Sequence, residues 1–212
     1  MAILDEISAA VQAGKKQDVE VLVQQAIDDG VSAQDILNDG LLAAMDIIGP
    51  KFKNNEIFIP EVLIAARAMN AGTALLKPLL AEADTKPLGK AVIGTVKGDM
   101  HDIGKNLVRM MIEGKGIEVA DLGVDVAPEA FVDYIKSNPE VSLVCLSALL
   151  TTTLPALENT VKTIIDAGLN NQVKILVGGA PVTQAFADQI GADGYSPDAG
   201  SAAAMAAELI AA

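Results

Sequence analysis

Apolar residues in the first 80 positions recur every three or four residues, which is the period of a helix with one buried face. Four such stretches follow one another, separated by short polar breaks. The third begins at Ser32, a residue type favoured at helix starts, and Gly49-Pro50 predicts a break near its end. The fourth opens at Pro60 and is expected to end at Pro78. Four amphipathic helices with short loops predict a small helical bundle.

From residue 90 onward, short apolar runs alternate with helix-like runs. The strand-like runs are 90–96, 118–122, 141–149, 173–177 and 194–195. The helix-like runs are 104–114, 128–137, 154–168, 183–190 and 200–210. Strict alternation predicts a parallel five-stranded sheet with helices on both faces, and strands that are apolar on both sides suit a sheet covered twice.

Between these halves, residues 81–89 are polar, contain Pro and Gly, and lack periodicity, so we expect a linker there. The chain is therefore predicted to be an α/β protein with a helical domain at 1–88 and a parallel-sheet domain at 89–212. The two domains are expected to move relative to each other through the linker.

Right-handed crossovers place every strand-to-helix loop at one edge of such a sheet, where open α/β sheets bind their ligands. These loops are rich in small residues and hydroxyls and cover 98–104, 123–127, 147–153, 178–181 and 196–200. Small residues let the backbone approach a ligand closely, and hydroxyls can donate to it. The loops therefore predict a slot for a long, mostly neutral ligand.

The first of these loops contains His101, the only histidine in the chain. Asp99 and Asp102 place carboxylates two positions before it and one position after it, an arrangement that a metal-bound imidazole needs. The alternative is that His101 only caps a helix or satisfies the loop. A metal site with one protein ligand is possible if the metal arrives inside a macrocycle that supplies the other nitrogens, as in haem proteins.

Composition narrows the class of protein further. The chain is 51% apolar but only 3% aromatic, so its core must be built from aliphatic side chains, which favours helices and a buried sheet. A net charge of −13 makes nucleic acid and anionic membranes poor partners. No stretch approaches the ~20 apolar residues of a spanning helix. The single Cys145 lies in a strand-like run, where a buried thiol and a reducing cytoplasm are expected.

Other chemistries fit the pattern poorly. The first strand is not followed by Gly-x-Gly-x-x-Gly, and no phosphate loop or Gly-x-Ser-x-Gly elbow is present, which disfavours nucleotide binding and a serine hydrolase. A zinc site needs more ligands than one histidine and a distant cysteine. Flavin binding stays open, because the same fold and crevice serve it, although the loops lack aromatic residues and that function would leave His101 unused.

Three spaced elements in the chain are similar to the cobalamin-binding signature of corrinoid proteins and of methionine synthase. They are Asp99-x-His101-x-x-Gly104, Ser147-x-Leu149 and Gly178-Gly179. The flanking residues 95–106 match as well, and so do 59–61 and 65–69 in the helical half, so the resemblance covers essentially the whole chain. It implies a four-helix cap domain followed by a flavodoxin-like (Rossmann-like) domain.

The resemblance also implies roles for individual residues. His101 would bind the cobalt of cobalamin from below in place of the cofactor's own benzimidazole, Asp99 would accept the other imidazole N–H, and Thr153 would complete the relay where the family has serine. Asn38 stands where a glutamate is expected to contact the corrin. The remaining candidate cofactor-binding residues are Gly98, Met100, Asp102, Ile103, Gly104, Ser147, Leu149, Thr151, Gly178, Gly179 and Ala199, with Phe52 and Ile59 in the helical half, where both could equally be bundle core.

By the same resemblance the chain is a methyl carrier without catalytic activity of its own. A substrate-specific methyltransferase of the methylated amine, quaternary amine or methanol class would load it. A second methyltransferase, of the tetrahydrofolate or coenzyme M type, would unload it, and a reductive activase would maintain it. The alternatives are the corrinoid subunit of an O-demethylase for methoxyaromatics and a cobalamin sensor or storage protein, although a sensor is expected to carry an output segment.

Overall fold

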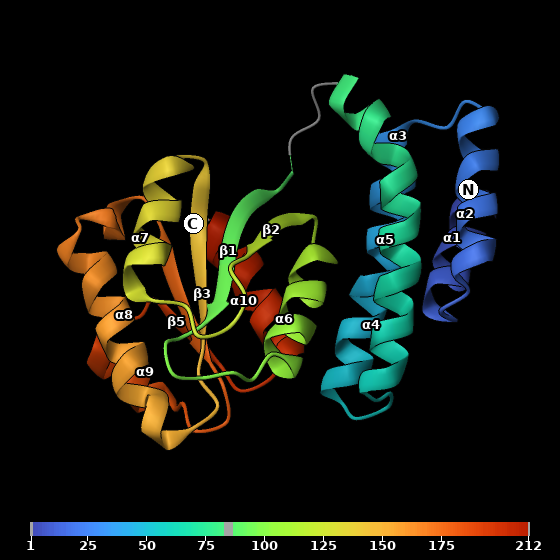
Figure 1. Cartoon of the computed structure of the whole chain (residues 1–212). Coiled ribbons are helices and arrows are strands. Elements are labelled where there is room, and N and C mark those ends of the chain that lie inside the picture. Colours follow the sequence, from blue (N-terminus) through green and yellow to red (C-terminus); the bar gives the residue numbers. More distant parts are fainter. Residues whose placement is uncertain (1, 83–86, 212) are drawn as a thin grey trace. The chain divides into compact units, whose positions relative to one another are not determined.

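The computed structural model describes residues 2–82 and 87–211, and the chain divides into two compact units, residues 1–86 and 87–212 (Figure 1). The described residues of the first unit form helices and no strand, whereas those of the second unit alternate between strands and helices. Within the described residues, no helix combines the length and the apolar composition needed to cross a membrane.

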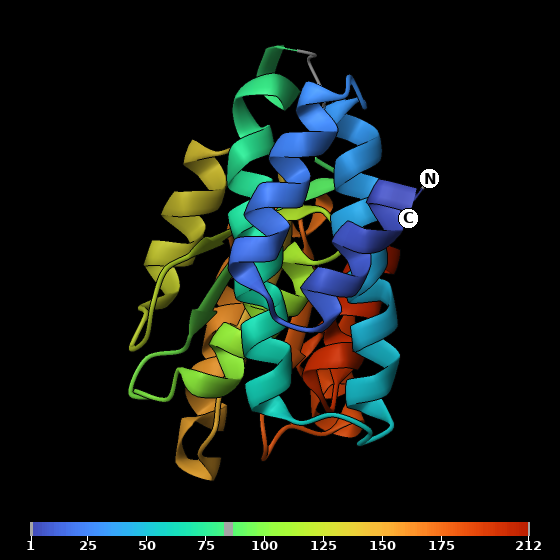
Figure 2. The same ribbon diagram turned by 90° about the vertical axis from the view of Figure 1, so that its right-hand side faces the viewer.

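The first unit is built from helices that run side by side (Figure 2). Its elements are α1 (Ala2–Gln12), α2 (Lys16–Asp28), α3 (Ala33–Asp35), a π-helix η1 (Ile36–Leu42), α4 (Ala43–Lys53) and α5 (Ile59–Glu82). Because α3, η1 and α4 follow one another without a break, they form one continuous helical segment. The described part of the unit therefore has the four helical segments predicted from the apolar periodicity. Helices α2 and α5 pack together although they are far apart in the sequence.

Two helix ends differ from the prediction. Helix α4 continues through Pro50 to Lys53, and α5 continues through Pro78. A proline inside a helix removes one backbone hydrogen bond and costs roughly 3 kcal/mol. Fully or nearly buried side chains such as Ile48 and Leu76, each just before one of these prolines, supply packing energy that offsets this cost.

The predicted linker at 81–89 is shorter than expected at both ends. Helix α5 extends through Glu82 and the first strand begins at Gly89. Residues 83–86, at the centre of the predicted linker, lie outside the described residues.

The second unit contains a parallel sheet in the order β2-β1-β3-β4-β5. Its strands are β1 (Gly89–Thr95), β2 (Ile117–Asp121), β3 (Val141–Ser147), β4 (Lys174–Gly178) and β5 (Gly194–Ser196). Its helices are α6 (Ile103–Glu113), α7 (Pro128–Ser137), α8 (Leu154–Asp166), α9 (Gln184–Ile190) and α10 (Ala199–Ala211), with short 3-10 turns η2 (Thr151–Thr153) and η3 (Leu169–Asn171). The predicted five-stranded flavodoxin-like sheet is confirmed.

Helices α6 and α10 cover one face of this sheet, and α7, α8 and α9 cover the other (Figure 1). The strand order changes direction between β1 and β3, since the chain passes from β1 to the edge strand β2 and then returns to β3. In an open α/β sheet the crevice at this switch point, outside the carboxyl ends of the strands, is where a ligand binds. The loops after β1 and β3, which contain His101 and Thr153, flank that crevice.

Candidate functional site

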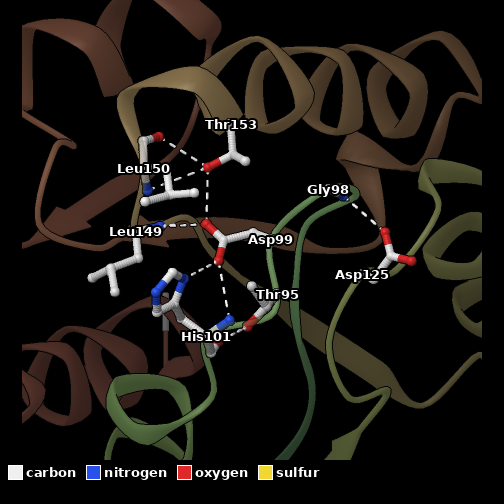
Figure 3. Close-up of polar contacts among 8 residues, drawn as sticks. All are labelled: Thr95, Gly98, Asp99, His101, Asp125, Leu149, Leu150 and Thr153. Carbon is white, nitrogen blue, oxygen red and sulfur yellow. Dashed lines mark hydrogen bonds and ion pairs between the residues drawn. The ribbon is translucent and has the colours of Figure 1, made fainter.

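The loop after β1 turns sharply at Gly98, whose φ of +82° is unfavourable for other residues. The Asp99 amide donates to Val96 O (3.1 Å), which closes the turn. Three residues after Gly98, the backbone carbonyl of His101 accepts a hydrogen bond from the buried hydroxyl of Thr95 (2.8 Å; Figure 3). The loop is therefore fixed at both ends before its side chains make any contact.

Asp99 and His101 form the centre of the site. The His101 Nδ1 atom lies 2.7 Å from Asp99 Oδ1, and the His101 amide donates to the same oxygen (3.1 Å; Figure 3). An ionised carboxylate only accepts, so we assign the ring hydrogen to Nδ1. This leaves the lone pair on Nε2, which has no hydrogen-bond partner among the described residues, while the His101 side chain is 49% exposed.

The second carboxylate oxygen of Asp99 is held from the loop after β3. Leu149 N–H (2.7 Å) and the Thr153 hydroxyl (2.8 Å) both donate to Oδ2. The Asp99 side chain is fully buried. Burial alone favours its neutral form, but the hydrogen bonds from Leu149, His101 and Thr153 outweigh burial and hold the pKa of Asp99 well below its ordinary value. Asp99 is therefore ionised at neutral pH without a lysine or arginine beside it.

A cleft of about 470 Å³ begins beside His101 and runs between the sheet and helices α6 and α10. The predicted site residues that line it are Met100, His101, Asp102, Ile103, Gly104, Ser147, Leu149, Gly178, Gly179 and Ala199. At Gly179, φ is +127° and a β-carbon would lie 1.8 Å from the Ala148 carbonyl oxygen, so only glycine fits. The cleft has the volume of a small-molecule site.

Exposed apolar side chains lie in the same loops as the imidazole and the residues that hold it. Met100 (69% exposed), Ile103 (74%), Leu149 (40%) and Leu150 (42%) all belong to the two loops that hold His101 and Asp99. A group of large apolar side chains exposed together on the surface is typical of a binding site. These side chains could therefore hold a flat apolar ligand beside the imidazole.

The other predicted site residues have different positions. Gly98 forms the turn, whereas Thr151 is exposed at the start of η2, and neither lines the cleft. Thr153 is buried and reaches the site only through Asp99. In the first unit, Phe52 is partly buried on α4 and Ile59 is 41% exposed at the start of α5.

Several residues of the site were not named individually by the sequence analysis, although most lie in the loops or flanks that it singled out. Lys105, Ser196 and Asp198 line the cleft, and Thr95 and Asp125 hold the loop that carries His101. The apolar run of β1 and the small-residue loop after β5 were visible in the sequence, but the contact between Asp125 N–H and the Asp99 carbonyl, 26 residues apart, was not. Cys145 is buried as predicted and lines the cleft, and burial raises the pKa of its thiol to about 12.

A second polar cluster lies where β2 ends and α6 begins. The buried Lys105 Nζ lies 2.5 Å from Asp121 Oδ2, and Arg109 Nη1 lies 3.2 Å from the same oxygen. Gly123 N–H donates to Asp121 Oδ1 (2.8 Å). Burial opposes the ionisation of Asp121, but Lys105 and the Gly123 amide outweigh it and lower its pKa. The charge of this carboxylate is thus compensated by two cations.

Among the described residues, no group of three or more His, Cys, Asp or Glu side chains could hold a metal ion. The site offers instead one imidazole with a fixed tautomer, a deep small-residue cleft and an apolar rim. This donor set fits a metal that arrives with its own equatorial ligands, such as the cobalt of a corrinoid, together with a long substituent that enters the cleft.

Comparison with known proteins agrees with this geometry. Residues 89–204 match one family model described as a B12 binding domain, and residues 3–77 match a second model with the same description. The chain is 41% identical to the dimethylamine corrinoid protein of Methanosarcina barkeri over 99% of this chain and 98% of that protein.

Two solved structures are similar over nearly the whole chain. One is a cobalamin-binding protein from Desulfitobacterium hafniense, with 31% identity, a TM-score of 0.80 and coverage of 97% of this chain and 98% of that one. The other belongs to the methanol:cobalamin methyltransferase complex of Methanosarcina barkeri, with 30% identity, a TM-score of 0.88 and coverage of 99% of this chain and 80% of that one.

Proposed function

Because this chain belongs to the B12-binding corrinoid proteins of methyltransferase systems, we propose that it carries methyl groups derived from a methylated amine. It binds a corrinoid of the cobalamin type, and the resemblance noted from the sequence is confirmed. When bound, the corrinoid supplies a cobalt ion that accepts a methyl group from one enzyme and yields it to another.

The observation that carries the site assignment is the Asp99–His101 pair. The ionised Asp99 favours the tautomer of the neutral imidazole with its hydrogen on Nδ1, which leaves the lone pair on Nε2, directed away from the carboxylate (Figure 3). Such a carboxylate–imidazole pair is the usual support for a metal-bound histidine, because it fixes both the tautomer and the ring orientation. Thr153 and Leu149 N–H hold the carboxylate in turn.

The remaining residues of the site would hold the rest of the cofactor. Gly178 and Gly179 leave room for the nucleotide tail between the sheet and the helices, and Ser147 and Ser196 are the hydroxyl groups that it would meet there. Met100, Ile103 and Leu149 would exclude water from the side of the ring that faces the protein. Thr151 and Asp102, both exposed, would contribute at the mouth.

In this proposal the sheet domain, residues 89–212, binds the corrinoid, and the helical domain, residues 1–88, has the role of the cap that the resemblance implies. Ile59 supports this role, since an exposed isoleucine at a helix start is free to contact an apolar ring. Phe52, on the preceding helix, is only partly buried. Asn38, which is exposed on the π-helix, would be the polar residue of the cap.

The choice of methyl donor rests on similarity in sequence. The chain is 41% identical to a dimethylamine corrinoid protein over 99% of its length and 42% identical to a trimethylamine corrinoid protein over 87% of its length. The partners would be a donor-specific methyltransferase, a second methyltransferase of the tetrahydrofolate or coenzyme M type, and a reductive activase. A cytoplasmic location is part of the proposal, and its support is the single reduced Cys145.

The test is methyl transfer with reconstituted protein. We expect the reduced, corrinoid-loaded chain to accept a methyl group from a mono-, di- or trimethylamine in the presence of the matching methyltransferase, with methanol and a methoxyaromatic donor as controls. Methylation only by methanol or by the aromatic ether would overturn the donor class. Failure of the chain to bind corrinoid at all would overturn the function.

A further inference from the structure

Asp125 lies in the loop between β2 and α7, yet it holds the loop that carries His101. Its Oδ1 accepts a hydrogen bond from Gly98 N–H (2.8 Å), and its own N–H donates to the Asp99 carbonyl (2.9 Å). Its Oδ2 forms an ion pair with Lys97 (3.0 Å). The first two contacts hold the peptide group before Gly98 and the peptide group after Asp99, so they fix both ends of the Gly98–Asp99 segment. Figure 3 shows the Asp125 carboxylate beside the Gly98 turn.

The backbone of Asp125 is in an unfavourable conformation. Its φ is +54°, in the left-handed region that glycine occupies without strain and that a residue with a β-carbon rarely adopts. Such outliers persist only where the surrounding structure holds them, and they gather at functional sites. The contacts of the side chain with Gly98 and Lys97 are what a glycine at this position would lose.

The geometry of the Asp99 carboxylate leaves little room for displacement. It makes contacts of 2.7 Å to His101 Nδ1, 2.7 Å to Leu149 N and 2.8 Å to the Thr153 hydroxyl. A shift of about 1 Å at the Asp99 backbone would lengthen these contacts beyond the range in which hydrogen bonds are strong. The imidazole would then lose the partner that fixes its ring orientation and tautomer.

We propose that Asp125 is a positioning residue for the cobalt ligand, acting through Gly98 and Asp99 to fix the direction of His101. The proposal rests on the proposed function, because it assigns a role toward the same corrinoid site. The competing role is that of an ordinary loop contact, which would stabilise the fold without affecting the imidazole.

Three variants separate these roles. Asp125→Gly removes the carboxylate and relieves the backbone strain, so it is the loss variant best able to fold. Asp125→Asn keeps an oxygen that can accept from Gly98 N–H and is the conservative rescue. Lys97→Met removes only the exposed ion pair and is the matched control.

The readout is the axial ligand of cobalt in protein reconstituted with cobalamin and reduced to Co(II), measured by electron paramagnetic resonance, together with the cobalamin dissociation constant. For Asp125→Gly we expect at least a threefold lower fraction of imidazole-bound cobalt and a dissociation constant raised about 10-fold, the cost of losing an outer partner of a metal ligand. Wild type, Asp125→Asn and Lys97→Met should all keep the imidazole bound. In the unloaded protein, amide hydrogen exchange over residues 97–101 should be faster in Asp125→Gly alone.

Imidazole binding and affinity like those of the wild type in Asp125→Gly would overturn the proposal, even if the variant unfolded at a lower temperature. If Asp125→Gly does not fold, Asp125→Ser gives the same two outcomes, since its side chain is too short to replace the carboxylate. A wild-type protein whose cobalt lacks imidazole would overturn the proposed function and this role together. Loss in Asp125→Gly alone would support both.

Discussion

Two carboxylates of the sheet domain lie near the carboxyl ends of neighbouring strands, and both have lowered pKa values for different reasons. Asp121 faces two cations, Lys105 and Arg109. Asp99 is fully buried, and the groups that donate to it are two backbone amides, a hydroxyl and an imidazole. The charge of Asp121 is therefore neutralised within the protein, whereas that of Asp99 can act on the ring of His101.

This difference separates a structural role from a functional one among residues of the same type. A carboxylate paired with lysine and arginine ties α6 to β2, and its charge is neutralised there. A carboxylate held by neutral dipoles stays ionised and retains its field, which makes the imidazole a stronger donor to a metal. We expect substitutions at the first cluster to change stability and substitutions at the second to change cofactor binding.

The largest effect on stability should come from Lys105→Ala. Removing the buried Lys105 leaves Asp121 only the partly exposed Arg109 and the Gly123 amide as partners, and we expect the free energy of unfolding to fall by about 1–3 kcal/mol. Lys174→Ala is the control, because its pair with Asp193 is exposed and should contribute less than about 1 kcal/mol. Denaturant unfolding measures both; equal losses in the two variants would show that the Lys105–Asp121 pair has no special importance.

Asp99→Asn should have the next largest effect, and on cofactor affinity. The amide can present an oxygen to Leu149 N–H and Thr153, but then its NH2 group meets His101 Nδ1 and favours the tautomer with hydrogen on Nε2. That hydrogen blocks metal binding, so corrinoid affinity should fall about 10- to 100-fold. Spectroscopic titration with cobalamin checks this, and an unchanged affinity would remove Asp99 from the site.

The fold was largely predictable and the exceptions have a physical cause. The strand order could be expected because apolar runs and right-handed crossovers leave few alternatives. The π-helix Ile36–Leu42 could not be expected, since its apolar spacing resembles that of an α-helix. Gly40 is part of it, and a β-carbon there would lie 3.1 Å from Ile7 of α1, so packing between helices contributes to this conformation.

The site was predictable only where its residues are close in sequence. Asp99 and His101 share one loop, and their spacing was informative. The Leu149 N–H is 50 residues from the Asp99 carboxylate that it holds, and the spacing of apolar residues along the chain gives no sign of that contact. The role of Asp125 was not predicted, because aspartate is common in turns for reasons unrelated to a binding site. Its φ and its hydrogen bond with Gly98 N–H are visible only in the structure.

Substitutions at Thr153 test how much one of the hydrogen bonds to Asp99 contributes. Thr153→Val removes the only hydroxyl that donates to Asp99 among the described residues while keeping the side-chain volume. A hydrogen bond to a charged group contributes about 1.5 kcal/mol or more, so we expect a loss near that value in unfolding free energy and a few-fold weaker corrinoid binding. Thr153→Ser keeps the hydroxyl and should be close to wild type. A loss in Thr153→Ser but not in Thr153→Val would show that the methyl group, and not the hydrogen bond, is what matters.

The pH dependence of stability should be the smallest effect near neutrality. Both carboxylates have folded-state pKa values below the unfolded value of about 3.9, so their stabilisation is present above that pH and is lost as the pH falls through the folded pKa values. The unfolding free energy should be nearly constant from about pH 5 to 8. Below about pH 5 it should decrease by up to about 1.4 kcal/mol per pH unit for each group. Asp121→Asn should approach the wild type at low pH; parallel curves would contradict this.

The most direct test uses the fact that His101 is the only histidine in the chain. Protein labelled with 15N-histidine is loaded with cobalamin and reduced to Co(II), and its electron paramagnetic resonance spectrum is compared with that of unlabelled protein. If His101 binds cobalt, labelling converts the nitrogen splitting from a triplet to a doublet, and His101→Ala lacks the splitting. A triplet that persists after labelling would mean that the benzimidazole of the cofactor still occupies the metal, which would contradict the account.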